Sequence, residues 1–335
     1  MFYDQVRTGF LRRAGDTVAK ILIIKLGALG DVVMATALIR QIQKYHAHDD
    51  VWLLTAPAYL EIFNSWRGLN VVAFGRKGLR DNLKTIAWIR KGDFVRVYDL
   101  QSSDRSALLC ALSGIPERVG NHTHFPYNLH PGDKYTGQCH IYDRMIEVLR
   151  SSGIAAAYEL PILPVADEDK NFVGSWLKYN GLLDRPFVIL HPGTSPGHQE
   201  KRWPYFLELA LALKDSGCTI VWVGADNERE TIRRYSGQVG IDAGNMFSIN
   251  MLAELGRYAR FAVTNDSGPM HVLSCSGIPV YAFFGPTNWR RNHAIGQAEN
   301  IIVSADSAPE KFMPVTLSNI TPAQVLHRLR ERKLL

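Results

Sequence analysis

Residues 21–31 read ILIIKLGALGD: four apolar residues lead into a lysine, a loop with two glycines, and then an aspartate. A helical pattern of apolar residues follows at positions 31–45. Four consecutive apolar residues are typical of a strand that is covered on both faces, as in a parallel sheet. The stretch therefore predicts the strand, loop and helix of an α/β unit, with the loop at the carboxyl end of the strand, where such sheets bind ligands.

The second half of the chain opens in the same way. Residues 187–204 read FVILHPGTSPGHQEKRWP, a hydrophobic run followed by a glycine-containing loop and a proline that starts the helical pattern 204–216. Further strand-like runs alternate with helical patterns in both halves, at positions 51–55, 94–100, 219–223, 261–264 and 280–284. This alternation predicts two doubly wound, Rossmann-like domains of the α/β class.

The alternation is interrupted between residues 153 and 185, where two prolines and an acidic run precede a short helix. We therefore expect a first domain at residues 1–165, with 1–18 as an extension, and a second domain at residues 166–318. A last helix is expected in residues 319–335, with Thr321 as its N-cap and Pro322 at its first position. Packing back on the first domain is one option for this helix.

The composition limits the class of protein. Among 335 residues, 46% are hydrophobic and 21% are charged, which excludes disordered, collagenous and coiled-coil chains. No apolar run approaches the ~18 residues that a membrane-spanning helix needs, and charged residues precede any apolar run at the N-terminus, so we expect a cytoplasmic protein. Four dispersed cysteines and several histidines match no zinc or disulfide spacing, so no metal is expected: Cys110, Cys139, Cys218 and Cys275.

The positive charge is concentrated in the first half. Residues 1–165 hold 20 basic and 15 acidic residues, a net charge of +5, whereas residues 166–335 hold 18 and 17, a net charge of +1. Such an asymmetry favours an anionic partner for the first domain, although a solvated basic surface without a partner is an equal alternative. The basic residues are dispersed and no recognition motif is present, so we expect no binding of nucleic acid.

The first loop places Asp31 at the start of a helix. Its glycines fit neither the GxGxxG dinucleotide fingerprint nor the GK[ST] of a phosphate-binding P-loop. One interpretation of Asp31 is an N-cap, because aspartate satisfies the free amides of a first turn. The other is a general base that points into a cleft, kept ionised by the helix N-terminus.

The loops after the other two central strands have the composition of a phosphate site. Residues 191–204 offer glycine, the hydroxyls of Thr194 and Ser195, and the cations Lys201 and Arg202. Residues 264–271, TNDSGPMH, offer a close approach at Gly268 and a proline near the start of a helix. Hydroxyls, backbone amides and cations are what an anionic phosphate requires. A nucleoside diphosphate is the ligand that explains both loops, and an ordinary polar loop is the alternative.

Together, the segments LGALGD, HPGTSPGHQEKRWP, TNDSGPMH and GIPVYAFFGPT resemble glycosyltransferase family 9, the heptosyltransferases of lipopolysaccharide core assembly. The segment YDLQSSDRSAL at 98–108 is also similar, and the resemblance runs from about residue 19 to residue 287. It implies a GT-B fold, in which two Rossmann-like domains face each other across a cleft. It also implies an inverting, metal-independent transfer of a sugar, typically a heptose from ADP-heptose, to a lipopolysaccharide core-type acceptor.

The resemblance assigns roles to particular residues. Asp31 matches the catalytic base, and Lys201 matches the lysine at the donor phosphate. An acidic residue after the next strand contacts the ribose in the family, and of Asp226 and Glu228 we prefer Asp226. The implied donor-binding residues are Thr194, Ser195, Lys201, Asp226, Asp266, Ser267, Gly268 and His271.

The acceptor is expected to be an anionic glycolipid bound by the first domain. A basic face would suit its phosphates or carboxylates, although charges on helices commonly face only solvent. The candidate acceptor-binding residues are Gly27, Gly30, Arg76, Arg80, Gln101, Arg105 and Arg118. A lipid acceptor makes peripheral attachment to the inner face of the cytoplasmic membrane a further expectation.

Two parts of the sequence depart from the family pattern. The N-terminal extension precedes the first strand, and Trp289, Arg290 and Arg291 follow FFGPT where the family commonly has a proline and a short glycine loop. These departures keep two alternatives open. One is a GT-B enzyme with another donor sugar or a protein or glycan acceptor, and the other is a nucleotide-sugar-binding protein without catalysis.

Overall fold

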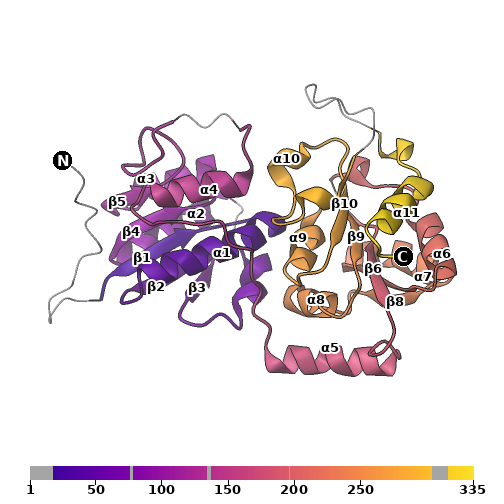
Figure 1. Cartoon of the computed structure of the whole chain (residues 1–335). Coiled ribbons are helices and arrows are strands. Elements are labelled where there is room, and N and C mark those ends of the chain that lie inside the picture. Colours follow the sequence, from indigo (N-terminus) through magenta and orange to yellow (C-terminus); the bar gives the residue numbers. More distant parts are fainter. Residues whose placement is uncertain (1–17, 76–77, 134–136, 196, 304–315) are drawn as a thin grey trace, which may run out of the picture.

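The computed structural model describes residues 18–75, 78–133, 137–195, 197–303 and 316–335. Its backbone forms two parallel sheets, one in each half of the chain (Figure 1). The expected extension at residues 1–18 lies outside the described residues except for its last residue. The expected α/β class with two doubly wound domains is confirmed.

The first sheet has five strands in the order β3-β2-β1-β4-β5. Its hydrophobic runs become strands because all side chains of the central strand, apart from its first residue, are buried between helices. The order in which successive strands are added to the sheet reverses between β1 and β4. Open α/β sheets bind ligands at such a switch point. The strands are β1 (Lys20–Ile24), β2 (Asp50–Thr55), β3 (Asn70–Ala73), β4 (Phe94–Asp99) and β5 (Glu117–Val119).

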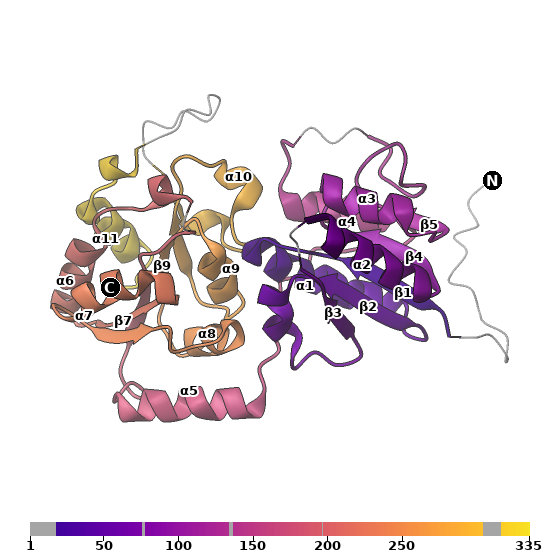
Figure 2. The same ribbon diagram turned by 180° about the vertical axis from the view of Figure 1, so that it is seen from behind.

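Helices cover both faces of this sheet. Helices α1 (Leu29–Tyr45) and α4 (Ile141–Arg150) share one apolar core with the 3-10 helix η1 (Pro57–Phe63). Helices α2 (Gly78–Lys91) and α3 (Asp104–Leu112) pack on the opposite face. Figure 1 shows α1 in front of the sheet, and Figure 2 shows α2 in front of it from behind.

The second sheet repeats this plan with one more strand, in the order β11-β10-β9-β6-β7-β8. Its switch point lies between β6 and β9, whose carboxyl ends carry the second and third predicted loops. The strands are β6 (Phe187–His191), β7 (Thr219–Gly224), β8 (Ile241–Gly244), β9 (Ala262–Asn265), β10 (Val280–Phe283) and β11 (Ile301–Ile302).

Two helical layers enclose the second sheet. One contains α6 (Phe206–Asp215), α7 (Arg229–Ser236) and α11 (Pro322–Glu331). The other contains α5 (Asp167–Tyr179), α8 (Ile249–Gly256) and α9 (Gly268–Ser274). Shorter elements lie in the loops: η2 (Gln199–Lys201), η3 (Asp226–Glu228), α10 (Trp289–Asn292), η4 (Ala298–Asn300) and η5 (Leu317–Asn319).

The two domains share an apolar contact. Helix α1 packs against α9, and Ala253, Val272 and Ile295 of the second domain belong to the core that α1 and α4 form. Asn250 of α8 adds a polar link, because its Nδ2 donates to the carbonyls of Ile62 (3.1 Å) and Pro164 (2.8 Å). The contact brings the carboxyl ends of both central strands toward one boundary.

The last helix lies against the second domain, so the option of packing back on the first domain is wrong. Thr321 caps α11 and Pro322 occupies its first turn, as expected. Val325 and Leu329 point into the core of the second domain, and the Trp203 indole donates to the Ile320 carbonyl just before the helix (2.8 Å). The apolar stripe of α11 is thus already covered by the sheet that precedes it in the chain.

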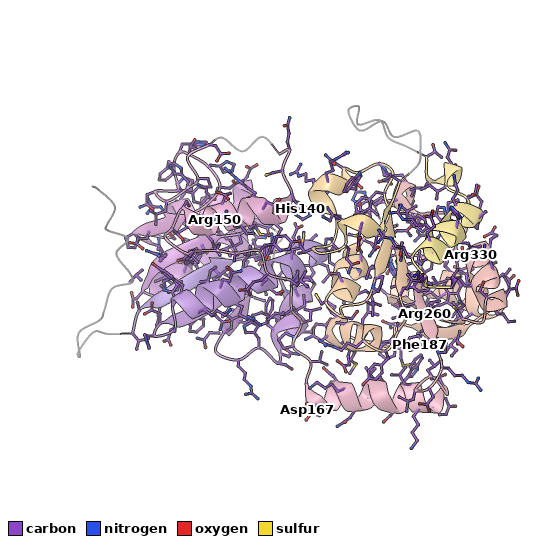
Figure 3. The ribbon with its side chains drawn as sticks, in the orientation of Figure 1. His140, Arg150, Asp167, Phe187, Arg260 and Arg330 are labelled. Atoms are coloured by element: carbon purple, nitrogen blue, oxygen red, sulfur yellow. The ribbon has the colours of Figure 1, made fainter. Side chains whose placement is uncertain are left out.

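Leu329→Ala should therefore destabilise the second domain by about 2–5 kcal/mol, because Leu329 is fully buried and its loss leaves a cavity. The control is Arg330→Ala, since Arg330 is exposed on the same helix and points away from the core (Figure 3). Urea unfolding of the three proteins measures the difference. Equal stability of Leu329→Ala and the control would contradict the observed packing.

Candidate functional site

Two cavities lie at the boundary between the domains. The large cavity has a volume of about 380 Å³ and is lined mainly by the second domain, with Leu29 and Glu61 from the first. The small cavity, of about 170 Å³, is lined mainly by the first domain, with Arg291 of α10 from the second. Both therefore take residues from both domains, at the strand ends where the sequence predicts ligand binding.

Asp31 lines the small cavity. It is the third residue of α1, whose N-cap is Ala28, so the N-cap interpretation of Asp31 is wrong. Its side chain is 31% exposed, and one carboxylate oxygen lies 4.0 Å from the ammonium nitrogen of Lys25. A carboxylate that faces a cavity and does not cap its helix has the placement that a general base requires.

Lys25 is buried beside Asp31. Its side chain is 2% exposed, and its Nζ donates to the Leu100 carbonyl at 2.9 Å. Burial lowers the pKa of Lys25, and the carboxylates of Asp31 and Asp99 act in the opposite direction. Sequence reasoning missed this residue. The available signal was a lysine that directly continues a fully buried apolar strand.

The first loop is held by Gln101 at the end of β4. The Gln101 side-chain oxygen accepts hydrogen bonds from the amides of Leu26 (2.8 Å) and Gly27 (3.1 Å). Gly27 has a φ of +139°, a conformation that favours glycine. Both were predicted to bind the acceptor. Gln101 also lines the small cavity, but the contacts that the structure gives these two residues serve to fix the loop.

Asp99, the last residue of β4, holds the backbone of Gln101 in place. It is fully buried, and its oxygens accept bonds from the Tyr127 hydroxyl (2.5 Å) and the amides of Gln101 (2.9 Å) and Ser102 (3.1 Å). Burial raises the pKa of Asp99, and these bonds oppose the rise. The strand end that faces Asp31 is therefore a rigid, hydrogen-bonded platform.

Gly30 and His271 form a close contact between the domains. A Cβ atom on Gly30 would lie 2.4 Å from Cδ2 of the His271 ring, so only glycine fits there. His271 is 6% exposed, and its Nδ1 has no hydrogen-bond partner among the described residues. Burial lowers the pKa of His271 to about 4, so the ring is neutral at pH 7. Gly30 and His271, predicted to bind the acceptor and the donor, thus meet in the contact between the domains.

Two further imidazoles lie at this boundary. His140 precedes α4 (Figure 3), and its ring centroid lies 4.4 Å from that of His293, which follows α10. His140 Nε2 is 3.0 Å from the His293 carbonyl. Burial lowers the pKa of each ring, and for His140 the neighbouring His293 contributes as well. The boundary is therefore built from neutral histidines.

The large cavity contains four of the predicted donor-binding residues: Thr194, Ser195, Ser267 and Gly268. Thr194 is 3% exposed, and its hydroxyl has no hydrogen-bond partner among the described residues. A buried hydroxyl without a partner is costly unless a ligand completes it. The volume also lies in the range of small-molecule sites.

Lys201 and Asp266 are bound to each other. The Lys201 Nζ lies 2.7 Å from an Asp266 oxygen, which also accepts a bond from the Thr287 hydroxyl (2.5 Å). The lysine side chain is 17% exposed and the aspartate 9%, and neither lines the large cavity. Two predicted donor-binding residues are thus brought together as a partly buried ion pair.

Of the two acidic candidates after β7, the structure places Glu228 and not Asp226 at the large cavity. The turn η3 directs the Asp226 side chain outward, where it is 78% exposed. Glu228 is buried and accepts bonds from the Ala225 amide (2.9 Å) and the His191 ring (3.2 Å). Burial raises the pKa of Glu228, but the bonds from His191 and Ala225 outweigh it, and the pKa lies below its usual value. Our preference for Asp226 is corrected accordingly.

The predicted basic residues do not line the small cavity. Arg76 lies outside the described residues. Arg80 is exposed on the first turn of α2, and Arg105 donates to the Gly75 carbonyl (2.9 Å). The Arg118 guanidinium donates to the carbonyls of its own loop, at Ile115 and Pro126 (2.5 Å each), because the chain turns back around it.

The cations that do line the small cavity come from other elements. Arg144 of α4 is 6% exposed and binds Asn121 and Asp133, and Arg291 reaches the cavity from α10. Sequence reasoning noted Arg291 as a departure from the family pattern, with an added anion contact and a solvated charge as equal alternatives. It missed Arg144, because an arginine in a helix carries no signal of burial.

The described residues form neither a metal-binding cluster nor a membrane-spanning helix. No group of three or more histidine, cysteine, aspartate or glutamate side chains in this part of the chain is arranged to hold a metal ion. None of its helices combines the length and the apolar character needed to cross a bilayer.

Comparison with known proteins gives consistent matches. The family model described as glycosyltransferase family 9 (heptosyltransferase) matches residues 83–319. Lipopolysaccharide heptosyltransferase 2 of Escherichia coli K12 is 25% identical over 352 residues, covering 92% of this chain and 97% of that protein. The lipopolysaccharide core heptosyltransferase OpsX of Haemophilus influenzae is 18% identical, covering 87% of this chain and 86% of that protein.

Solved structures show the same fold. The crystal structure of a family 9 glycosyltransferase from Veillonella parvula superimposes with a TM-score of 0.79 at 21% identity, covering 93% of this chain and 96% of that one. The E. coli ADP-heptose heptosyltransferase II structure gives a TM-score of 0.73 at 22% identity, covering 93% and 98%. The architecture is thus that of these enzymes.

The lowered pKa of His271 predicts a loss of stability in acid. Below about pH 6.5 the unfolded chain binds a proton at this ring, whereas the folded chain does not until about pH 4. Stability is therefore lost as the pH falls through this window, by about 2 kcal/mol for this ring between pH 7 and pH 5. His140 and His293 act in the same direction.

Urea unfolding of the natural chain and of His271→Gln at both pH values measures this contribution, which the variant should lack. His327→Gln is the control, because His327 is 76% exposed. An unchanged pH dependence in His271→Gln would show that the ring is not held neutral by burial.

Proposed function

Because the chain belongs to glycosyltransferase family 9, we propose that this glycosyltransferase moves a heptose from ADP-heptose to a lipopolysaccharide core-type acceptor. The family match covers residues 83–319, and the curated relatives that it resembles are named as lipopolysaccharide and lipooligosaccharide heptosyltransferases. The observation that carries the proposal is the placement of Asp31, a partly exposed carboxylate in a cavity of the first domain, opposite the phosphate-type loops of the second.

The proposed reaction is a single displacement. An acceptor hydroxyl in the small cavity attacks the anomeric carbon, and Asp31 accepts its proton as the bond to the departing diphosphate breaks. Attack from the side opposite the leaving group inverts the anomeric carbon. The buried ammonium of Lys25 stabilises the Asp31 carboxylate before the reaction. The platform formed by Gln101 and Asp99 fixes the loop that carries it.

The donor occupies the large cavity in this proposal. The free hydroxyl of Thr194 and the loop around Ser267 bind the phosphates, and Glu228 is placed to accept from the ribose hydroxyls. Lys201 exchanges its bond to Asp266 for one to the diphosphate and stabilises the negative charge that develops there. This cation takes the role that a metal ion has in other transferases, so the proposed reaction requires no metal.

The acceptor is an anionic glycolipid in this proposal. Arg291 and Arg144 lie at the small cavity and supply positive charge toward phosphates or sugar acids of a lipopolysaccharide core. An acceptor of this kind is held by a membrane, so we also propose peripheral attachment to the inner face of the cytoplasmic membrane.

Asp31→Asn tests the reaction. The variant should lose about 10²–10⁴-fold in the rate of heptose transfer, because the amide cannot accept the proton. ADP should still raise the melting temperature as it does for the natural chain, since Asp31 lies outside the large cavity.

The assay uses ADP-heptose and a deacylated core acceptor in the presence of EDTA. Transfer by Asp31→Asn at the natural rate would remove Asp31 from the mechanism. If the natural chain transfers no heptose and is stabilised by UDP or GDP in place of ADP, the donor is a different nucleotide sugar and not ADP-heptose. Stabilisation by ADP without any transfer would leave only a nucleotide-binding function.

Glu228→Gln and Asp226→Asn separate the two acidic candidates. The first should weaken ADP binding about 10-fold or more, because a charge-assisted bond to the ribose is worth on the order of 1.5–3 kcal/mol. The second should leave binding unchanged, because Asp226 points to solvent. Calorimetric titration with ADP gives both affinities. A larger loss in Asp226→Asn would restore our sequence-based preference.

A further inference from the structure

The outer face of α2 and α3 carries exposed leucines. Leu79 and Leu83 of α2 are 73% and 58% exposed, and Leu108 and Leu112 of α3 are 43% and 40% exposed. In each helix the two leucines are four residues apart and therefore lie on one side. The buried side of α2, formed by Thr85, Ile86 and Ile89, adjoins the side of the leucines, because Ile86 follows Leu83 by three residues.

The two helices form one continuous surface. They pack side by side, and the Arg90 Nε donates to the Leu112 carbonyl at the end of α3 (2.8 Å). The second domain contacts the first through α1 and η1, which lie on the opposite face of the sheet. The outer face of α2 and α3 is therefore not used for the contact between the domains. The four leucines are thus left without a partner in the described part of the chain.

Cations surround these leucines. Arg80, Lys84, Arg90 and Lys91 are exposed on α2, and none of them forms an ion pair within the described residues. Exposed carboxylates lie only at the ends of the surface, with Asp104 at the start of α3 and Asp93 beyond the end of α2. Positive charge therefore dominates the centre of this face.

The combination of exposed leucines and cations favours a membrane over a protein as the partner of this face. The cores of protein interfaces are depleted in lysine and in charge. Helices that lie on a membrane combine leucines, which enter the acyl boundary, with lysines and arginines, which bind the anionic headgroups. We propose that the outer face of α2 and α3 docks on a bilayer that contains anionic phospholipid.

The position of the surface fits the small cavity. Helix α3 begins two residues after Ser102, which lines that cavity together with Gln101. The bond from Arg105 to Gly75 ties the first turn of α3 to the segment before α2. Docking therefore places the opening beside Asp31 near the membrane that holds the acceptor. This last step rests on the proposed function, whereas the docking itself does not.

Sedimentation with vesicles tests the surface. The full chain should bind phosphatidylcholine vesicles that contain phosphatidylglycerol, and bind vesicles of phosphatidylcholine alone at least tenfold more weakly. Two double variants, Leu79→Gln with Leu83→Gln and Lys84→Gln with Lys91→Gln, should each lose at least tenfold in binding. The matched control is Leu211→Gln with Lys214→Gln, an exposed leucine and lysine on α6 of the second domain; it should bind as the natural chain does.

Three outcomes would overturn the proposal: no binding to anionic vesicles, binding that survives both double variants, and a dimer in sedimentation velocity that the leucine variant dissociates. Transfer to a deacylated, water-soluble acceptor is measured in parallel and should be unchanged in all variants. Vesicle binding without transfer would count against the proposed transfer reaction only, and transfer without vesicle binding would count against the surface and the proposed membrane attachment but not against the reaction.

Discussion

The contact between Gly30 and His271 sets the geometry on which the site depends. It lies where α1 of the first domain meets α9 of the second, and it leaves no space for a side chain at position 30. Gly30 lies in the first turn of α1 and His271 within the short helix α9, so the contact holds the start of α1, which carries Asp31, against the helix that follows Ser267. Asp31 and the large cavity are thereby positioned relative to each other by one van der Waals contact.

The electrostatics of the boundary follow from its burial. Three histidines meet there, and each is kept neutral by the loss of water. Positive charge at the site comes instead from Lys25, Lys201 and the arginines of α4 and α10. Lys25 and the two arginines lie at the small cavity and Lys201 lies beside Asp266, while the contact between the domains carries little charge.

Hydrophobic periodicity was sufficient to predict the two sheets, because runs such as 21–24 and 187–190 are buried on both faces and have no other stable environment. The loops that follow these runs were predictable as ligand sites because they lie at the carboxyl ends of the strands. Thr194, Ser195 and Asp31 were singled out from the composition of these loops, and all three line a cavity. The side chains within those loops were harder to place. Asp226 and Glu228 are two residues apart in one turn, and only the direction of that turn decides which one faces the cavity.

Long-range contacts account for the remaining differences. Arg118 was predicted to face the acceptor, but its own loop folds back and occupies the guanidinium. Arg144 reaches the small cavity from a helix about 40 residues beyond the strand ends, and no local pattern indicates this. The surface on which α11 packs depends on which apolar surface the other helices leave uncovered. That surface exists only once the domain has folded, so no local pattern in the sequence indicates it.

The ion pair between Lys201 and Asp266 has a consequence for turnover. The Lys201 ammonium lies 2.7 Å from an Asp266 oxygen, so in the proposed function a diphosphate that binds Lys201 takes the place of this carboxylate. Under this proposal Asp266 competes with substrate and product for the same cation, and the competition lowers the affinity for both. The same proposal has Asp266 bind Lys201 again after transfer, so that the nucleotide leaves without an unpaired ammonium remaining in this partly buried place.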